Sequence, residues 1–200
     1  MLVSGLWMPA AGMALLAARL GRAGYSTHLL ACHGREPMVV NMERLARHAR
    51  ETLQGRPAHY VGHSLGGLLV LETLGSNPDL PVASVLLLGT PARGCLAGRR
   101  LARYGMGRWM LGAAGAHWEE RQACWLRAEP LGVVAGTRPL GIALALGALP
   151  GANDGVVRVE ETTVDGMAAR ALVSMGHTVL IASSRVARLV ERFLASGRFE

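Results

Sequence analysis

The chain has 200 residues, half of them hydrophobic, and a formal net charge of +7 at pH 7. This length and composition fit one globular domain with a real core, and they exclude a disordered or fibrous protein. All of the basic charge is arginine, and an aromatic content of 4% leaves few side chains that could stack on bases, so we expect no nucleic-acid binding.

Cysteine usage and hydropathy indicate the cellular compartment. Cys32, Cys95 and Cys124 are an odd number without metal-ligand spacing, which is typical of reduced thiols rather than of a disulfide framework or a zinc site. No apolar run is long and charge-free enough to span a bilayer, and the apolar start lacks the basic segment of a signal peptide. We therefore expect a cytoplasmic protein.

Short strands alternate with amphipathic helices in the first half of the chain. Residues 1–3 and 25–30 are expected to be strands, and positions 13, 16, 17 and 20 place apolar side chains on one face of a helix. Asn41 is a suitable N-cap for a helix with apolar positions 42, 45, 46, 49 and 53. Residues 58–61 then read as a strand and residues 68–74 as a helix.

The second half continues the alternation. Residues 82–88 are a continuous apolar run of the kind found in buried parallel strands. Residues 133–135 and 171–173 predict two further strands, and the apolar spacing over 179–195 predicts one final helix. The pattern indicates an α/β fold, with a mostly parallel sheet of about six strands covered by helices on both faces.

The segment Gly62-His63-Ser64-Leu65-Gly66-Gly67 lies between a predicted strand and a predicted helix. A G-x-S-x-G motif in that context is a nucleophile elbow, in which a strained turn presents the serine hydroxyl. The flanking glycines allow the strand and the helix to approach closely. A glycine-rich turn without function is the simpler alternative, but the context favours Ser64 as a nucleophile.

A nucleophilic serine needs a base and an acid that orients it. Asp154, in Asn153-Asp154-Gly155, and His177, in Gly176-His177-Thr178, follow predicted strands in the chain order serine, acid, histidine. Each has an ordinary alternative, because Asn-Asp-Gly favours turns and His177 precedes a helix. The weaker candidates for the acid are Asp79, Asp165, Glu160 and Glu161.

These motifs resemble those of the α/β-hydrolase superfamily, and in particular its small lipase- and esterase-like members. The resemblance implies an oxyanion hole formed by the backbone N–H of Leu65 and that of Leu6 or Trp7. The family usually has His-Gly at the end of the first central strand, where this chain has Ser4-Gly5. Loss of that histidine is expected to loosen the loop that aims the second donor.

Two segments, within 93–126 and 138–150, do not fit the alternation and are candidates for small lid elements in a fold with a minimal cap or none. Ordinary helix packing is the alternative, because Met and Trp fill cores as readily as they line pockets. The candidate substrate-binding residues are His63, Met106, Trp109, Met110, Leu140 and Ile142.

The sequence therefore predicts a serine carboxylic-ester hydrolase that works through an acyl-enzyme and requires neither a metal nor an organic cofactor. An acyltransferase with the same three side chains, or a non-catalytic binding protein with this fold, are the alternatives. The expected partner is a small-molecule or lipid ester. Weak association with a membrane surface is compatible with the basic charge.

Overall fold

A computed structural model describes residues 1–140 and 147–200. The described residues contain one six-stranded sheet with the order β2-β1-β3-β4-β5-β6, and each neighbouring pair of strands is parallel. The strands are β1 (Leu2–Ser4), β2 (Leu29–Ala31), β3 (Ala58–His63), β4 (Val82–Leu88), β5 (Leu131–Gly136) and β6 (Ala169–Val173). The predicted sheet of about six mostly parallel strands is therefore confirmed, although β2 is shorter than residues 25–30.

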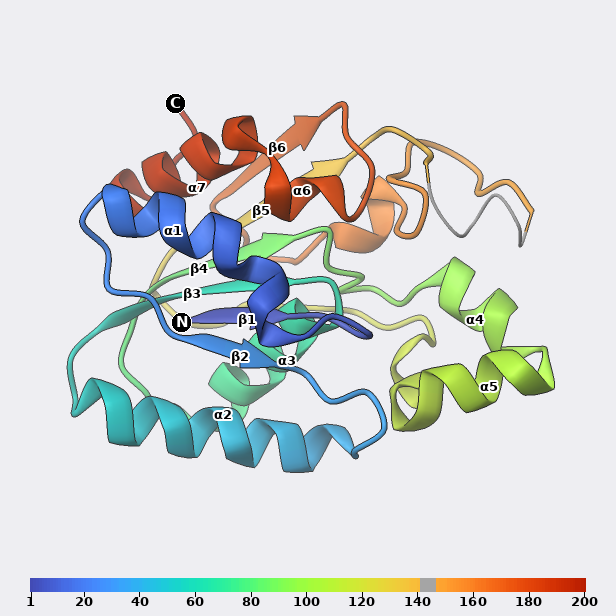
Figure 1. The fold of residues 1–200 in the computed structure, drawn as a ribbon, viewed down its shortest axis with the longest axis horizontal. Helices are drawn as coiled ribbons and strands as arrows, with labels where there is room; N and C mark the ends of the chain where they lie inside the picture. The colour runs from blue at the N-terminus through green and yellow to red at the C-terminus, as the bar shows by residue number, and fades with distance from the viewer. Residues whose placement is uncertain (141–146) are drawn as a thin grey trace.

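Helices cover both faces of the sheet (Figure 1). One side carries α1 (Ala14–Arg22), α6 (Val179–Ala182) and α7 (Ser184–Ser196), and the other carries α2 (Met38–Leu53) and α3 (Leu65–Ser76). Two more helices, α4 (Leu96–Ala102) and α5 (Gly105–Leu111), lie beyond the C-terminal ends of the strands. Short 3-10 helices occur at η1 (Ala10–Met13), η2 (Gly112–His117) and η4 (Val159–Thr162).

Strand β4 shows how the sequence divides the core. Val85 and Leu87 pack in the cluster on the α2 and α3 side, whereas Leu86 and Leu88 pack in the cluster on the α1 and α7 side. All four side chains are fully buried, because successive side chains of a strand point to opposite faces and both faces are covered by helices. This explains why the strand is apolar throughout rather than at alternate positions.

The expectation that Asn41 caps a helix is wrong. Helix α2 begins at Met38 after Pro37, whose fixed φ of −54° suits a helix start, so Asn41 lies inside the first turn. The Asn41 amide instead accepts a hydrogen bond from His33 N at 2.8 Å and donates one to His33 O at 3.0 Å. The Asn41 side chain therefore fixes the loop in front of the helix instead of capping the helix.

The predicted single helix over 179–195 is divided in two. Ser183 has extended backbone angles, and its hydroxyl accepts hydrogen bonds from the N–H groups of Arg185 and Val186, so it caps α7. The apolar positions of α6 and α7 both face the sheet, as Leu180 and Val190 do, and the apolar spacing therefore continues across the break. Periodicity alone could not reveal it.

Candidate active site

Ser64 occupies the turn between β3 and α3 with φ 54° and ψ −127°. A positive φ is costly for a residue with a side chain and persists only where the surroundings hold it. The glycines around it are required by contact: a Cβ on Gly62 would lie 2.4 Å from Gly67 Cα, and one on Gly66 would lie 2.5 Å from Ser4 O. Strand, turn and helix thus close tightly around the serine, as the motif predicts.

Asp154 and His177 are brought together by the loops that follow β5 and β6. The His177 Nδ1 atom lies 2.7 Å from Asp154 Oδ2. The other carboxylate oxygen, Oδ1, accepts hydrogen bonds from Val156 N at 2.9 Å and Val157 N at 2.7 Å. An ionised carboxylate keeps the proton on Nδ1, which leaves Nε2 of the imidazole as the acceptor.

The backbone also joins these two loops, because His177 N donates to Asp154 O at 2.9 Å. Gly89, after β4, has φ 54°, and a Cβ there would lie 3.0 Å from Asp154 Oδ2 and 3.1 Å from His177 Nδ1. The residue that follows β4 therefore approaches the Asp154–His177 hydrogen bond closely, and it has no side chain that would clash there. A group of buried contacts fixes the orientation of the imidazole.

Ser64 and His177 line the same cavity, whose volume is about 300 Å³. No hydrogen bond between the Ser64 hydroxyl and the His177 ring is found among the described residues, and such bonds are commonly long until substrate is bound. The remaining wall is largely apolar. It includes Leu6, Trp7, Met8, Pro91, Cys95, Ala97, Leu101, Leu111, Trp118, Leu140, Val156 and Val157.

The loop after β1 lies against the serine. A Cβ on Gly5 would be 2.8 Å from Ser64 Cβ and 3.3 Å from Leu65 N, so Gly5 leaves the space beside the hydroxyl open. The Met8 N–H donates to Gly5 O at 3.3 Å, and the Ser4 hydroxyl donates to Met8 O at 2.9 Å. The buried Ser4 hydroxyl therefore ties down the loop that loss of the histidine was expected to loosen.

His63 precedes the serine and is buried. It lines the cavity, and its Nε2 lies 3.2 Å from the backbone oxygen of His177, while the two imidazole centroids are 4.7 Å apart. Burial, together with the neighbouring imidazole, lowers the pKa of His63 to about 3. His63 is thus neutral near pH 7, and its Nε2 contacts the loop that carries His177.

The other predicted substrate-binding residues divide into groups. Leu140 lines the cavity, whereas Trp109 and Met110 line a neighbouring groove and Met106 is 70% exposed. Ile142 lies outside the described residues. Met106, Trp109 and Met110 are therefore not brought to the serine.

The cavity wall contains residues that the sequence analysis did not single out. Leu101 and Leu111, from α4 and α5, are two of them, and the buried Trp118 lies in the same wall. They come from segment 93–126, for which the sequence analysis left open a small lid element or ordinary helix packing. Their exact identity had no sequence signal, because each is one apolar residue among many in that segment.

The rival acids are engaged elsewhere. Asp79 pairs with Arg50 at 2.9 Å, and Asp165 pairs with Arg93. Glu161 accepts from Leu96 N at 2.7 Å and, like Glu160, pairs with Arg158. Within residues 1–140 and 147–200, no group of three or more His, Cys, Asp or Glu side chains could hold a metal ion.

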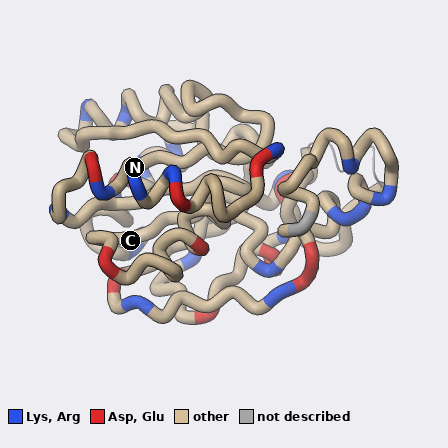
Figure 2. Tube along the Cα trace, turned by 90° about the horizontal axis from the view of Figure 1, so that it is seen from below, with Lys and Arg blue, Asp and Glu red and all other residues tan. Residues whose placement is uncertain are grey.

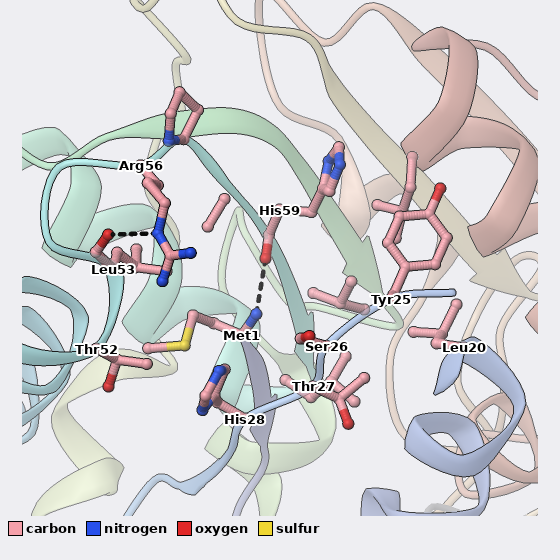
Figure 3. A pocket seen from close by; sticks show the side chains of 15 residues that line it. Met1, Leu20, Tyr25, Ser26, Thr27, His28, Thr52, Leu53, Arg56 and His59 are labelled. Carbon is pink, nitrogen blue, oxygen red and sulfur yellow. Dashed lines mark hydrogen bonds between the residues drawn. The ribbon is translucent and has the colours of Figure 1, made fainter. Parts of the chain in front are cut away.

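A second cavity, of about 430 Å³, lies near the N-terminal ends of β1 and β3 (Figure 3). Its wall includes Tyr25, His28 and His59, and the Met1 amino group donates to His59 O at 2.8 Å. The His59 ring contacts the hydroxyl of Ser84, but Ser84 is buried and does not line the cavity. Ser26, Thr27 and Thr52 also line the cavity, but among the described residues no hydrogen bond joins their hydroxyls to the His28 or His59 ring.

The all-parallel sheet with helices on both faces is that of the α/β-hydrolase fold, and the chain has that fold. Mature lipase BlEst2 from Bacillus licheniformis superposes with a TM-score of 0.75 at 19% identity, over 97% of this chain and 89% of that one. The metagenomic carboxyl esterase MGS0156 gives a TM-score of 0.62 at 19% identity, over 98% and 75%. Phospholipase PlaB from Legionella pneumophila gives 0.70 at 13% identity, over 97% of this chain and 59% of the phospholipase.

No protein-family model matches the sequence, and no curated protein sequence matches it. Among residues 1–140 and 147–200, no helix has both the length and the apolar character that crossing a membrane would require.

Proposed function

We propose that this protein is a serine hydrolase of carboxylic esters that works through an acyl-enzyme. Ser64 Oγ attacks the ester carbonyl while His177 Nε2 takes its proton, and Asp154 holds the imidazole in the required tautomer. His177 then returns the proton to the leaving alcohol, and a water molecule, activated by the same nitrogen, releases the acid. The observation that carries the proposal is the strained Ser64 turn in one cavity with the Asp154–His177 hydrogen bond.

Two backbone N–H groups would stabilise the oxyanion. Leu65 N lies at the start of α3, where the helix dipole also favours negative charge. The second donor is the N–H of Leu6 or Trp7, in the loop that packs against Ser64 through Gly5. Loss of one such donor typically costs about 3–4 kcal/mol of transition-state stabilisation.

The cavity favours an ester with an apolar acyl group. Leu101, Leu111 and Trp118 would contact the acyl chain, and a volume of about 300 Å³ is small for a ligand site. Lipase, phospholipase and carboxyl esterase, the names of the structural neighbours, all denote enzymes that act on esters. Turnover of a p-nitrophenyl ester series is expected to peak at short or medium chain length.

Ser64→Ala tests the assignment directly. Turnover of p-nitrophenyl butyrate is expected to fall to background, and labelling by a fluorophosphonate probe is expected to disappear. Ser76→Ala, at an exposed position at the end of α3, is the matched control and should retain both. Unchanged turnover or labelling in purified Ser64→Ala protein would reject the proposal.

Acyl transfer uses the same three side chains and the same intermediate. Product analysis in the presence of a primary alcohol separates the two reactions, because hydrolysis yields the free acid and transfer yields a new ester.

A further inference from the structure

Four large apolar side chains are exposed on segments that line the cavity that holds Ser64: the loop after β1, α5 and the loop after β5. Their exposed fractions are 55% for Trp7, 70% for Met106, 64% for Trp109 and 54% for Leu140. Trp7 and Leu140 also line that cavity, and Trp7 shares the neighbouring groove with Trp109. We call these four residues the apolar patch. Such a patch on a surface marks a contact with something apolar.

The patch is held in place rather than loosely attached. The Trp7 indole N–H donates to Met110 O at 2.9 Å, which ties the loop after β1 to α5. Met106 and Trp109 are three residues apart on α5 and therefore share one face of that helix. The indole of Trp109 stacks under the Arg35 guanidinium, 4.8 Å from the ring centroid. The patch is thus a built surface that adjoins the opening to the serine.

Positive charge accompanies these apolar side chains. Residues 96–111, which form α4 and α5 and are here called the arm, contain four arginines and no acidic residue. Arg99 pairs with Glu120, and Arg100 donates to Gly147 O, but Arg103 and Arg108 are exposed and make no salt bridge with any described residue. Figure 2 shows this excess of basic residues: the projecting lobe at the right, which holds α4 and α5, has blue segments and no red ones.

We propose that the patch and the arm form a docking surface for an anionic lipid bilayer. Exposed indole rings favour the interface between headgroups and acyl chains, where one edge is wet and the rest is apolar. Unpaired arginines add attraction to anionic headgroups. The charge pattern selects a lipid surface over an apolar partner protein, because a protein face complementary to the patch would leave Arg103 and Arg108 without anionic partners.

Docking through the patch and the arm brings the opening of the serine cavity against the membrane. A lipid ester could then pass from the bilayer between Trp7 and Leu140, which line both the patch and the cavity. This last step rests on the proposed ester hydrolase activity, whereas the docking itself does not. The substrate class that follows is a lipid ester held in the bilayer, of which the cavity of about 300 Å³ would take only the part of the acyl chain next to the carbonyl.

Vesicle binding tests the docking separately from catalysis. Ser64→Ala protein is mixed with vesicles of phosphatidylglycerol and phosphatidylcholine, or of phosphatidylcholine alone, and the bound fraction is measured by co-sedimentation. Binding to the anionic vesicles is expected to be tighter, with a blue shift of tryptophan fluorescence that Trp109→Ser reduces. Trp118 and Trp125 are buried and should contribute little to that shift.

Two matched double variants distinguish docking through the arm from binding by net charge alone. Arg103→Gln/Arg108→Gln is expected to weaken binding to anionic vesicles about 25-fold, at about fivefold for each arginine near the surface. Arg188→Gln/Arg192→Gln removes the same charge from α7, which lies away from the arm, and should change binding less than twofold. Both variants, with Ser64 intact, should hydrolyse a soluble short-chain ester at the wild-type rate.

Equal losses in the two double variants would overturn the proposal, because they would show binding by net charge alone. Absence of vesicle binding would overturn it as well, as would a dimer in gel filtration that Trp109→Ser converts to a monomer while vesicles remain unbound. Vesicle binding by Ser64→Ala protein without any esterase activity in the wild type would support the docking and reject the proposed function.

Discussion

Replacement of Asp154 by asparagine tests the role of the carboxylate with little change of shape. Oδ1 of residue 154 accepts two backbone N–H bonds, from Val156 and Val157, so the amide oxygen must occupy that position. The amide nitrogen then takes the place of Oδ2, 2.7 Å from His177 Nδ1. Because an amide nitrogen donates only, it forces the proton of the imidazole onto Nε2, the atom that must accept a proton from Ser64.

We therefore expect Asp154→Asn to lower kcat by about 10⁴-fold, or roughly 5 kcal/mol in barrier, with little change in KM. The fold should lose only about 1 kcal/mol, since the backbone bonds remain. Asp165→Asn is the control, because Asp165 pairs with Arg93 away from the imidazole. Steady-state kinetics on p-nitrophenyl butyrate decide, and an Asp154→Asn enzyme within tenfold of wild type would refute the reasoning.

Three further predictions concern other parts of the molecule. Gly89→Ala should abolish most ester turnover and cost about 1–2 kcal/mol of stability, because it places a Cβ at the Asp154–His177 hydrogen bond on a residue with a positive φ. Gly75→Ala, at an open helical site, should instead stabilise the protein by about 0.5–1 kcal/mol. Activity assays and urea unfolding check both variants. The pKa of His63 is lowered to about 3 by burial, so the unfolded chain binds its proton first, and stability should fall by about 4–5 kcal/mol as pH drops from 6.5 to 3. Urea unfolding across that range should show a flatter profile for His63→Gln, and an unchanged profile would contradict this. In native protein a thiol reagent should modify only the exposed Cys124, because burial raises the pKa of the other two thiols to about 12; more than one modified thiol would be inconsistent with the structure.

The sheet was predictable because its strands have strong local signals. The apolar run over 82–88 is β4 residue for residue, and the glycine-flanked Ser64 marks the turn after β3. Parallel strands with helices between them place their C-terminal ends at one edge, and this was enough to predict that Asp154 and His177 would meet.

Predictions failed where a residue type serves two purposes. Asn41 has the chemistry of a cap, but the proline before the helix sets its start and frees the amide to bond the preceding loop. Ser183 interrupts a helix without interrupting its apolar spacing. Which Met and Trp of segment 93–126 face the cavity depends on how α4 and α5 pack, which no local pattern encodes.

The hydrogen bond from His177 N to Asp154 O links the loop after β5 to the loop after β6, the edge strand of the sheet. As the ribosome makes this chain, Ser64 emerges more than a hundred residues before His177. The residues of the elbow and of strands β1 to β4 are therefore made before the proposed base, His177. Under the proposed mechanism, the site is assembled only when β6 docks on β5 and brings His177 to Asp154.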